Sequence, residues 1–294
     1  MRIYDFMKFK YVWFSISGIA LLIGLIFLII NGGLNLGIDF TGGTSIQANI
    51  GKDFDIEDVR SIAAGFDKEA IVTYAGNDNE IALIRTKLAL DEQTQTDLIS
   101  SFKGMFGIDA TNMQFDVIGP AIGDELKQQA LIALLLAMVG ILLYVSIRFE
   151  WRFGIAAIAS LFHDVLMMVA VFAVLQIPVN SSFIAAILTI VGYSINDTIV
   201  IFDKVRENIK FGKKMSTSEV INTSVSQTLA RTINTSLTTL ITIVVIFILG
   251  VPSLREFSLP LMVGIISGSY STIFIASPVW IALKGKGKVG EALQ

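Results

Sequence analysis

Two charged residues stand in apolar surroundings. Asp197 lies beside Asn196 in an apolar run over residues 183–203, and Arg231 opens the next apolar run. A charged side chain at the centre of a membrane helix costs roughly 2.5–3.5 kcal/mol on insertion scales. An acid and a base on neighbouring helices can bind and release a proton, because each charge changes how readily the other group ionises. The pattern therefore indicates proton binding inside a membrane.

Both residues belong to polar stripes, since residues three and four apart share a helical face. One stripe consists of Tyr193, Ser194 and Asp197, and the other of Arg231, Asn234, Thr235 and Thr238. We expect the stripes to face protein or water, not lipid, with Asp197 and Arg231 close enough to pair. The alternative is a static ion pair, or an arginine whose charged end reaches the membrane surface.

A second polar pair, His163 and Asp164, stands about halfway along the apolar run 153–175. A relay role and a packing role are both open, and a side-by-side pair in mid-span favours packing or tuning. The chain has no cysteine and one histidine, which argues against a thiolate or histidine-rich metal site. It also lacks a P-loop motif. We therefore expect no metal and no cofactor, with energy from an ion gradient or a partner. H⁺ is the expected coupling ion and Na⁺ the alternative, although Asp197 and Arg231 do not form the oxygen-rich shell that would favour Na⁺.

Composition places the chain in a membrane. It has 294 residues, 53% of them hydrophobic, and a mean hydropathy of +0.70, which together predict several spans. A net charge of −3 argues against a nucleic-acid partner. Six runs are long enough to cross a bilayer, at residues 11–30, 129–147, 153–175, 183–203, 232–250 and 258–282. We interpret the first as a retained helix, because no A-x-A-like cleavage site follows it.

The runs divide the chain into three parts. Residues 1–33 form the first transmembrane helix, residues 34–124 a separate head domain with its linkers, and residues 125–294 the other five helices. Basic residues concentrate before the first run and in alternate links, which predicts that both termini are cytoplasmic and the head extracytoplasmic. Residues 216–230 could form an amphipathic helix on the cytoplasmic surface. The small residues Gly264 and Gly268 would allow a close helix contact.

The head alternates predicted strands and helices. Strands are expected at 43–50, 69–74, 80–87 and 112–118, with helices at 55–66 and 91–105. The order βαββαβ is that of an α+β ferredoxin-like domain. Glycine-containing linkers join it to the membrane part and could act as hinges or as tight exits that need small residues. The residues of interest are Gly37, Asp39, Gly42, Gly43, Gly119, Pro120 and Gly123.

Four motifs together resemble the SecD/SecF family of bacterial protein-export membrane proteins, on its SecF side. They are GIDFTGG at 37–43, RFEWR at 148–152, the pair His163-Asp164, and VGYSINDTIVIFD at 191–203. The resemblance covers the whole chain. It implies a six-helix bundle, half of a resistance-nodulation-division (RND) transporter, with the head between its first two helices.

The resemblance also implies a role. The chain would pair with SecD, associate with the SecYEG channel in the bacterial inner membrane, and use the proton motive force to promote preprotein translocation after the ATP-driven SecA step. Family roles in the proton pathway carry over to Asp197 and Arg231. The alternative is half of an RND-type exporter of small molecules or lipids.

Overall fold

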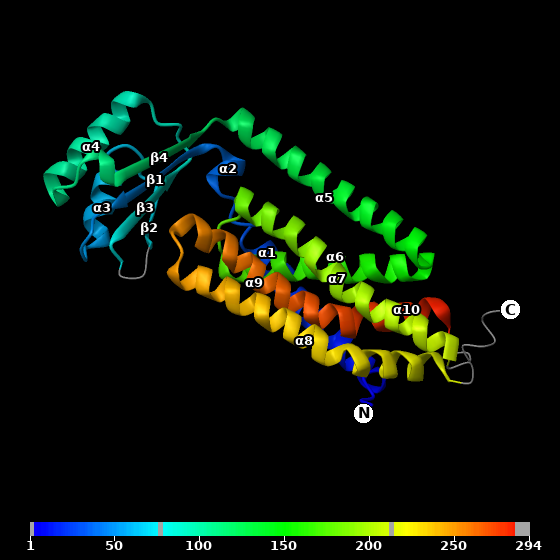
Figure 1. The fold of residues 1–294 in the computed structure, drawn as a ribbon. Coiled ribbons are helices and arrows are strands. Elements are labelled where there is room, and N and C mark those ends of the chain that lie inside the picture. The colour runs from blue at the N-terminus through cyan, green and yellow to red at the C-terminus, as the bar shows by residue number, and fades with distance from the viewer. Residues whose placement is uncertain (1–2, 76–78, 212–214, 286–294) are drawn as a thin grey trace.

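The computed structural model describes residues 3–75, 79–211 and 215–285. A small α+β head stands at one end of a long helix bundle, and two connections cross between them (Figure 1). Each part has its own hydrophobic core. A helix bundle with a separate head is the fold class expected from the sequence.

The head is built on four antiparallel strands, β1 (Gly43–Asn49), β2 (Ile71–Ala75), β3 (Ile81–Thr86) and β4 (Met113–Ile118). Their order is β2-β3-β1-β4, which is the ferredoxin-like arrangement predicted from the element order. Ile46 of β1 faces Ile84 of β3 and Phe115 of β4 across the sheet. Alternate residues point to one face, so these apolar positions meet the helices that cover it.

Helices α3 (Ile56–Ala63) and α4 (Glu92–Phe106) pack on that face through Val59 and Phe102, both fully buried. Both begin at an aspartate whose side chain accepts a backbone N–H, Asp55 from Glu57 and Asp91 from Thr94. Hydrogen bonds from the Thr94 side chain and backbone lower the pKa of the Asp91 carboxyl. These caps satisfy N–H groups that have no partner inside the helix.

Six helices in the described ranges are long and apolar enough to cross a membrane. They are α1 (Lys10–Ile30), preceded by the 3₁₀ turn η1 (Met7–Phe9), α5 (Pro120–Arg148), α6 (Trp151–Leu175), α7 (Ser181–Phe211), α8 (Thr217–Leu249), and a last span made of α9 (Pro252–Ser271), the π-helical segment η3 (Thr272–Ala276) and α10 (Ser277–Lys284). The six expected spans are confirmed.

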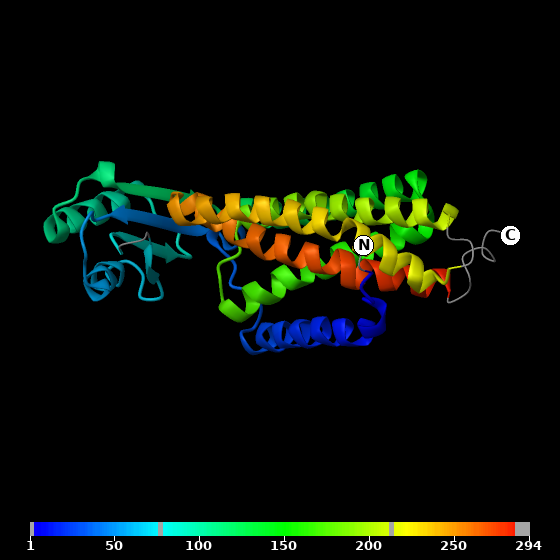
Figure 2. The same ribbon diagram turned by 60° about the horizontal axis from the view of Figure 1, so that its bottom comes forward.

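Helices α6, α7 and α9 form the buried centre, while α1, α5 and α8 lie around it (Figures 1 and 2). Glycines bring the helices into close contact. A Cβ on Gly264 of α9 would lie 2.4 Å from Ile190 Cγ1 of α7, and one on Gly24 of α1 would lie 2.3 Å from Ala170 Cβ of α6. The close approach expected at Gly264 is therefore present.

Helix boundaries differ from the sequence prediction in three places. Helix α5 begins at Pro120, not at the predicted domain boundary of 125, and α7 continues to Phe211. Residues 217–230 do not form a separate surface helix but the first half of α8. Their apolar side chains, such as Val220 and Ile221, are fully buried in the bundle. The amphipathic pattern was real, but its apolar face covers protein and not lipid.

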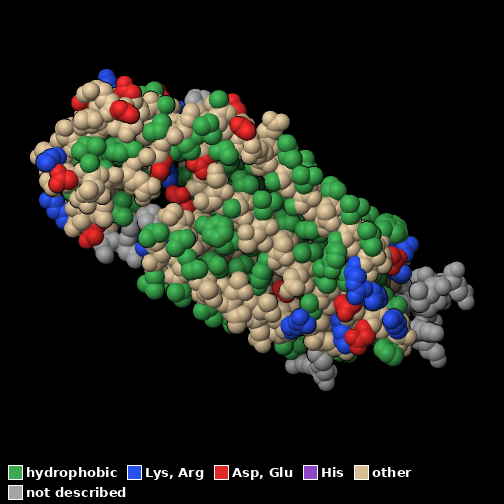
Figure 3. All heavy atoms as spheres, turned by 45° about the horizontal axis from the view of Figure 1, so that its top comes forward, with side chains coloured by type: hydrophobic (Ala, Val, Ile, Leu, Met, Phe, Trp, Pro, Cys, Tyr) green, Lys and Arg blue, Asp and Glu red, His purple; other side chains and the backbone are tan. Residues whose placement is uncertain are grey.

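Charged side chains gather at the head and at the opposite end of the bundle, and the face between them is mostly hydrophobic or uncharged (Figure 3). Such a belt is what a bilayer requires of the surface that it covers. The chain is a multi-pass membrane protein.

A short polar junction joins the head to the bundle. The Gly37 N–H donates to the Val179 carbonyl at 2.6 Å, and the Ser181 N–H donates to Asp39 Oδ2 at 2.7 Å. Arg85 of β3 forms an ion pair with Glu256 of α9 at 3.2 Å. The head is thus fastened at the α6–α7 loop and at the start of α9, in addition to its two covalent connections.

Candidate proton site and polar network

Asp197 lies inside the bundle, with only 5% of its surface exposed. Its Oδ2 is 3.4 Å from Ser236 Oγ of α8, a long contact for a hydroxyl donor. Ser236 itself accepts a hydrogen bond from Ser269 of α9 at 2.7 Å. One turn before Ser236, the buried Thr232 hydroxyl has no hydrogen-bond partner among the described residues. The carboxylate therefore sits between α7, α8 and α9 with weak hydrogen bonding.

Arg231 does not form an ion pair with Asp197: no nitrogen–oxygen distance of 4.0 Å or less joins them in the described structure. Its side chain is exposed and lines a cavity of about 560 Å³ between α5, α7 and α8. The same cavity contains Asp203, Lys204 and Glu207. Arg231 thus stands near the buried acid, at the end of the bundle away from the head, without contacting it.

Asn196 points away from Asp197. It is exposed on the outer face of α7, as are Arg231, Asn234 and Thr238 on α8. Only the Asp197 side of the α7 stripe is therefore buried, together with Ser194, which turns toward α6. In the α8 stripe, the Thr235 and Thr238 hydroxyls donate to carbonyls of their own helix.

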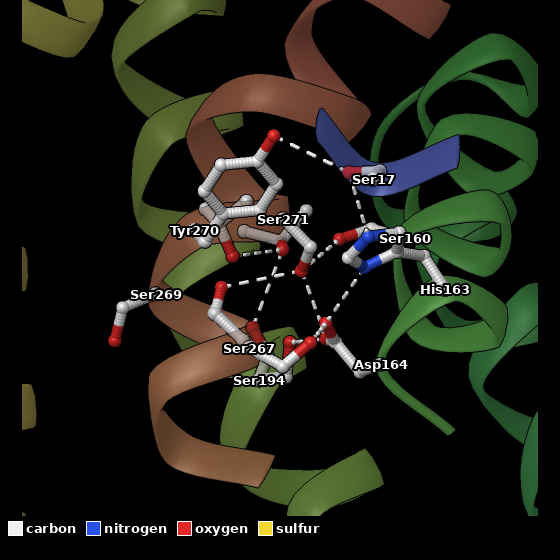
Figure 4. A network of polar contacts seen from close by, with 12 residues as sticks. Ser17, Ser160, His163, Asp164, Ser194, Ser267, Ser269, Tyr270 and Ser271 are labelled. Carbon is white, nitrogen blue, oxygen red and sulfur yellow. Dashed lines mark hydrogen bonds and ion pairs between the residues drawn. The ribbon is translucent and has the colours of Figure 1, made fainter. Parts of the chain in front are cut away.

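Asp164 is the centre of a separate buried network (Figure 4). Its carboxylate accepts hydrogen bonds from Ser194 of α7 at 2.7 Å and from two serines of α9, Ser267 at 2.7 Å and Ser271 at 2.9 Å. Ser160, one turn earlier on α6, donates to Ser271 at 2.8 Å. Three helices are thus joined at one acid that is 1% exposed. Asp164 is far better supplied with donors than Asp197.

His163 extends this network to α1. Its Nδ1 lies 3.3 Å from Asp164 Oδ1 and its Nε2 lies 3.0 Å from Ser17 Oγ. Ser17 in turn contacts the Tyr270 hydroxyl at 3.2 Å, and Tyr270 donates to the Trp13 carbonyl at 2.7 Å. The histidine ring also stacks near the Tyr270 ring.

The linker residues lie in tight, hydrogen-bonded places. Gly37 precedes a short helix, α2 (Ile38–Thr41), which ends at Gly42 with a φ of +71°. A Cβ on Gly43 would lie 2.1 Å from the Thr86 carbonyl oxygen, and one on Gly123 would lie 3.0 Å from that of Phe40.

Gly119 caps α5, and Pro120 is the first residue of that helix. Gly119 has open space around it, since a Cβ there would meet no heavy atom of the described residues within 4 Å. Close packing thus accounts for Gly37, Gly43 and Gly123, and the hinge interpretation stays a prediction.

Sequence reasoning did not identify Ser17, Ser160 or Tyr270 as members of this network. Ser160 carried a usable signal, since it lies four residues before Asp164 and so shares its helical face. Ser17 and Tyr270 carried none, because their partner lies more than a hundred residues away in the chain.

Comparison with known proteins identifies the family to which the chain belongs. The model for "Protein export membrane protein SecD/SecF, C-terminal" matches residues 97–286, and that for the "SecD/SecF GG Motif" matches residues 27–51. The chain thus combines a membrane helix bundle and a ferredoxin-like head with the sequence motifs of one protein class. The chain belongs to the SecD/SecF family.

Similar proteins cover nearly the whole chain. Protein translocase subunit SecF of Haemophilus influenzae is 39% identical over 272 residues, covering 92% of this chain and 83% of the relative. SecF of Rhodothermus marinus is 38% identical, covering 99% and 96%. The protein translocase subunit SecDF of Bacillus subtilis is 38% identical, but the match spans only 38% of its length.

Among solved structures, SecDF of Thermus thermophilus, described as a translocon-associated membrane protein, matches with a TM-score of 0.87 and 35% identity. The match covers 96% of this chain and 39% of that one. SecDF in a super-membrane-facing form matches with a TM-score of 0.68 over 97% of this chain. The fold expected from the sequence is therefore confirmed.

Proposed function

We propose that the chain is a subunit of the bacterial Sec protein translocase that uses the proton motive force to promote preprotein translocation after the ATP-driven SecA step. Relatives named as translocase subunits match this chain over most of its length, which supports the role. Their names describe protein movement and not a chemical conversion, so the role assigned to this chain is mechanical and not enzymatic.

The observation that carries proton coupling is the poor hydrogen bonding of Asp197. An ionised carboxylate buried in a bilayer is costly unless donors surround it. Among the described residues Asp197 has one donor, at 3.4 Å, so protonation removes the buried charge and gives up little hydrogen bonding. Protonation would also remove its attraction to the positive charge of Arg231 on α8. The packing of α7 against α8 therefore differs between the two protonation states.

We also propose that a partner protein forms the other half of a larger helix bundle. Asn196, Arg231, Asn234 and Thr238 are exposed on α7 and α8, and lipid would be a costly neighbour for such polar groups. In the SecDF relatives the region matching this chain occupies less than half of a longer protein. We infer that SecD covers this face and completes the two-half bundle, which in turn meets the SecYEG channel and the preprotein.

The orientation follows from charge. Basic residues lie at the end of the bundle away from the head, including Lys204, Arg206 and Arg148. By the positive-inside rule this supports our proposal that both termini are cytoplasmic and that the head lies outside the inner membrane. The junction at Arg85 and Glu256 would carry movements of α9 to the head.

The test compares two acids on one helix. Asp197→Asn should abolish the gradient-dependent part of preprotein export into inverted vesicles, measured with and without an uncoupler. The matched variant Asp203→Asn changes an exposed acid of α7 and should keep that part. Equal co-purification with SecD shows that both variants assemble. Full gradient-dependent export by Asp197→Asn would overturn the coupling proposal.

A further inference from the structure

The hydrogen bonds around His163 have a fixed direction. Tyr270 has one hydroxyl hydrogen, and its 2.7 Å contact with the Trp13 carbonyl takes it, because a carbonyl can only accept. The Tyr270 oxygen must then accept from Ser17 in the longer contact of 3.2 Å. The Ser17 hydrogen is thereby used.

The direction of these hydrogen bonds also determines which nitrogen of the imidazole ring bears a proton. Since Ser17 has no hydrogen left, it accepts from His163, and Nε2 must bear a proton. On the other side of the ring, Nδ1 faces Asp164 Oδ1 at 3.3 Å. A bare nitrogen lone pair and a carboxylate oxygen would repel each other there. A second proton must lie between them, on the ring or on the carboxyl group.

We propose that His163 and Asp164 together form a proton-binding site, distinct from Asp197, that holds one exchangeable proton. In the loaded state Nε2 is protonated and a second proton joins Nδ1 to Asp164 Oδ1. The inference rests on the geometry of α1, α6 and α9 and does not depend on the export role.

Release of the proton needs only hydroxyl rotations. The proton on Nε2 leaves, and the ring keeps one proton, on Nδ1, donated to the Asp164 carboxylate. The Ser17 hydroxyl then turns from Tyr270 to Nε2, and the Tyr270 hydroxyl turns from the Trp13 carbonyl to Ser17. The net change is one proton lost, with no bond between heavy atoms formed or broken.

The surroundings leave this couple isolated from other charges. From α1 it meets Ser17, from α7 Ser194, and from α9 Ser267, Tyr270 and Ser271. Among the residues that the structure describes, Tyr270 is the one other titratable side chain in contact with the network, and no Lys or Arg forms an ion pair with Asp164. The three serines hold the carboxylate in place in both states.

The site connects α9 to α1, which the hydrogen bonds of Asp197 do not reach. It is hydrogen-bonded to α1 through Ser17. It is hydrogen-bonded to the segment of α9 just before η3 through Ser267 and Ser271. Gly268 allows this contact, since a Cβ there would lie 3.1 Å from Ser194. Loading and unloading therefore change the hydrogen bond that ties α1 to α9.

The test uses the fact that the chain has a single histidine. The full chain, labelled with ¹⁵N-histidine and reconstituted in lipid nanodiscs, gives imidazole signals from His163 alone. We expect Nε2 to lose its proton when the sample is taken from acidic to alkaline buffer. A ring whose Nε2 state is the same in both buffers would overturn the proposal.

Variants test the direction of the chain of bonds. Tyr270→Phe removes the acceptor of the Ser17 hydrogen and frees that hydrogen to compete with the proton on Nε2, so the loaded state should be weakened. Tyr193→Phe is the matched control, because its hydroxyl bonds Thr235 and Thr239 on α8. Asp164→Asn, which cannot share the proton, should lose the loaded state. Identical spectra for Tyr270→Phe and Tyr193→Phe would refute the assignment, whatever their effect on export.

Discussion

Gly43→Ala should loosen the head domain strongly. Gly43 begins β1 with a φ of +125°, a conformation that side chains with a Cβ rarely adopt. A Cβ there would lie 2.1 Å from the Thr86 carbonyl oxygen and 3.0 Å from Lys87 Cα. Both obstacles are backbone atoms of the neighbouring strand β3 and its end, so rotation of a side chain cannot relieve them.

The magnitude follows from two contributions. Backbone strain of this kind costs about 1–3 kcal/mol, and forced overpacking about 1–3 kcal/mol, so we expect a loss of about 2–6 kcal/mol. A domain the size of the head has a free energy of unfolding of about 4–11 kcal/mol at 0.05–0.15 kcal/mol per residue. The substitution would therefore remove a large part of the stability of the head and leave the bundle folded.

Hydrogen exchange of the full chain, read by mass spectrometry, measures this directly. For a loss of about 4 kcal/mol the protection of β1 and β3 amides falls roughly 10³-fold, at about 1.4 kcal/mol per tenfold. Gly51 has a φ of +69° with open space around it, so Gly51→Ala should cost less stability. Gly104 lies in helix α4, also with open space, so Gly104→Ala is a second control. Protection in Gly43→Ala equal to that in Gly104→Ala would refute the steric reasoning.

Three further predictions concern packing, the junction and acid sensitivity. Gly264→Ala places a Cβ 2.4 Å from Ile190 Cγ1 and should lower the free energy of unfolding by about 1–3 kcal/mol. Gly192→Ala, with open space, should not, and equal melting temperatures would contradict this. Arg85→Ala and Glu256→Gln should show a coupling of about 0.2–1 kcal/mol in a double-mutant cycle read by amide exchange of β3, because the pair is partly exposed. The coupling should fall with added salt, and additive effects would exclude it. The pKa of Asp91 is lowered in the folded head, so its stabilising effect is present above the usual value of 3.8 and is lost as pH falls through the lower folded pKa. The protection of amides at the start of α4, corrected for the pH dependence of intrinsic amide exchange, should therefore fall on acidification in the native chain and change less in Asp91→Asn, and parallel pH curves would disprove it.

The head and the spans were predictable because their signals are local. The alternation in residues 43–50, the aspartates before α3 and α4, and the long apolar runs each depend on neighbours in the chain. The length of α7 and α8 was not predictable in the same way. These ends contain apolar residues, Val205 and Val220, that are fully buried in the core of the bundle, and no local pattern shows that burial.

The sequence pointed to the two acids inside the bundle but did not identify their hydrogen-bond partners. Asp197 and Asp164 stood out because carboxylates in apolar runs are rare. The sequence could not show that Asp164 collects three serines while Asp197 collects one distant donor, since those partners come from helices separated by 30 to over 100 residues. Nor could it show that Asn196 faces outward, because adjacent residues on a helix point in different directions.

The π-helical segment η3 also sets how the last span meets its neighbours. Each residue of an α-helix turns the chain by about 100°, so one additional residue in a wider turn offsets everything after it by that amount. Before η3 the span presents serines to Asp164, and after it Trp280 stacks on Phe153 with ring centroids 4.9 Å apart. A regular helix with the same residues would turn one of these faces outward. The wider turn thus lets a single span serve a polar contact and an aromatic contact on the same side of the bundle.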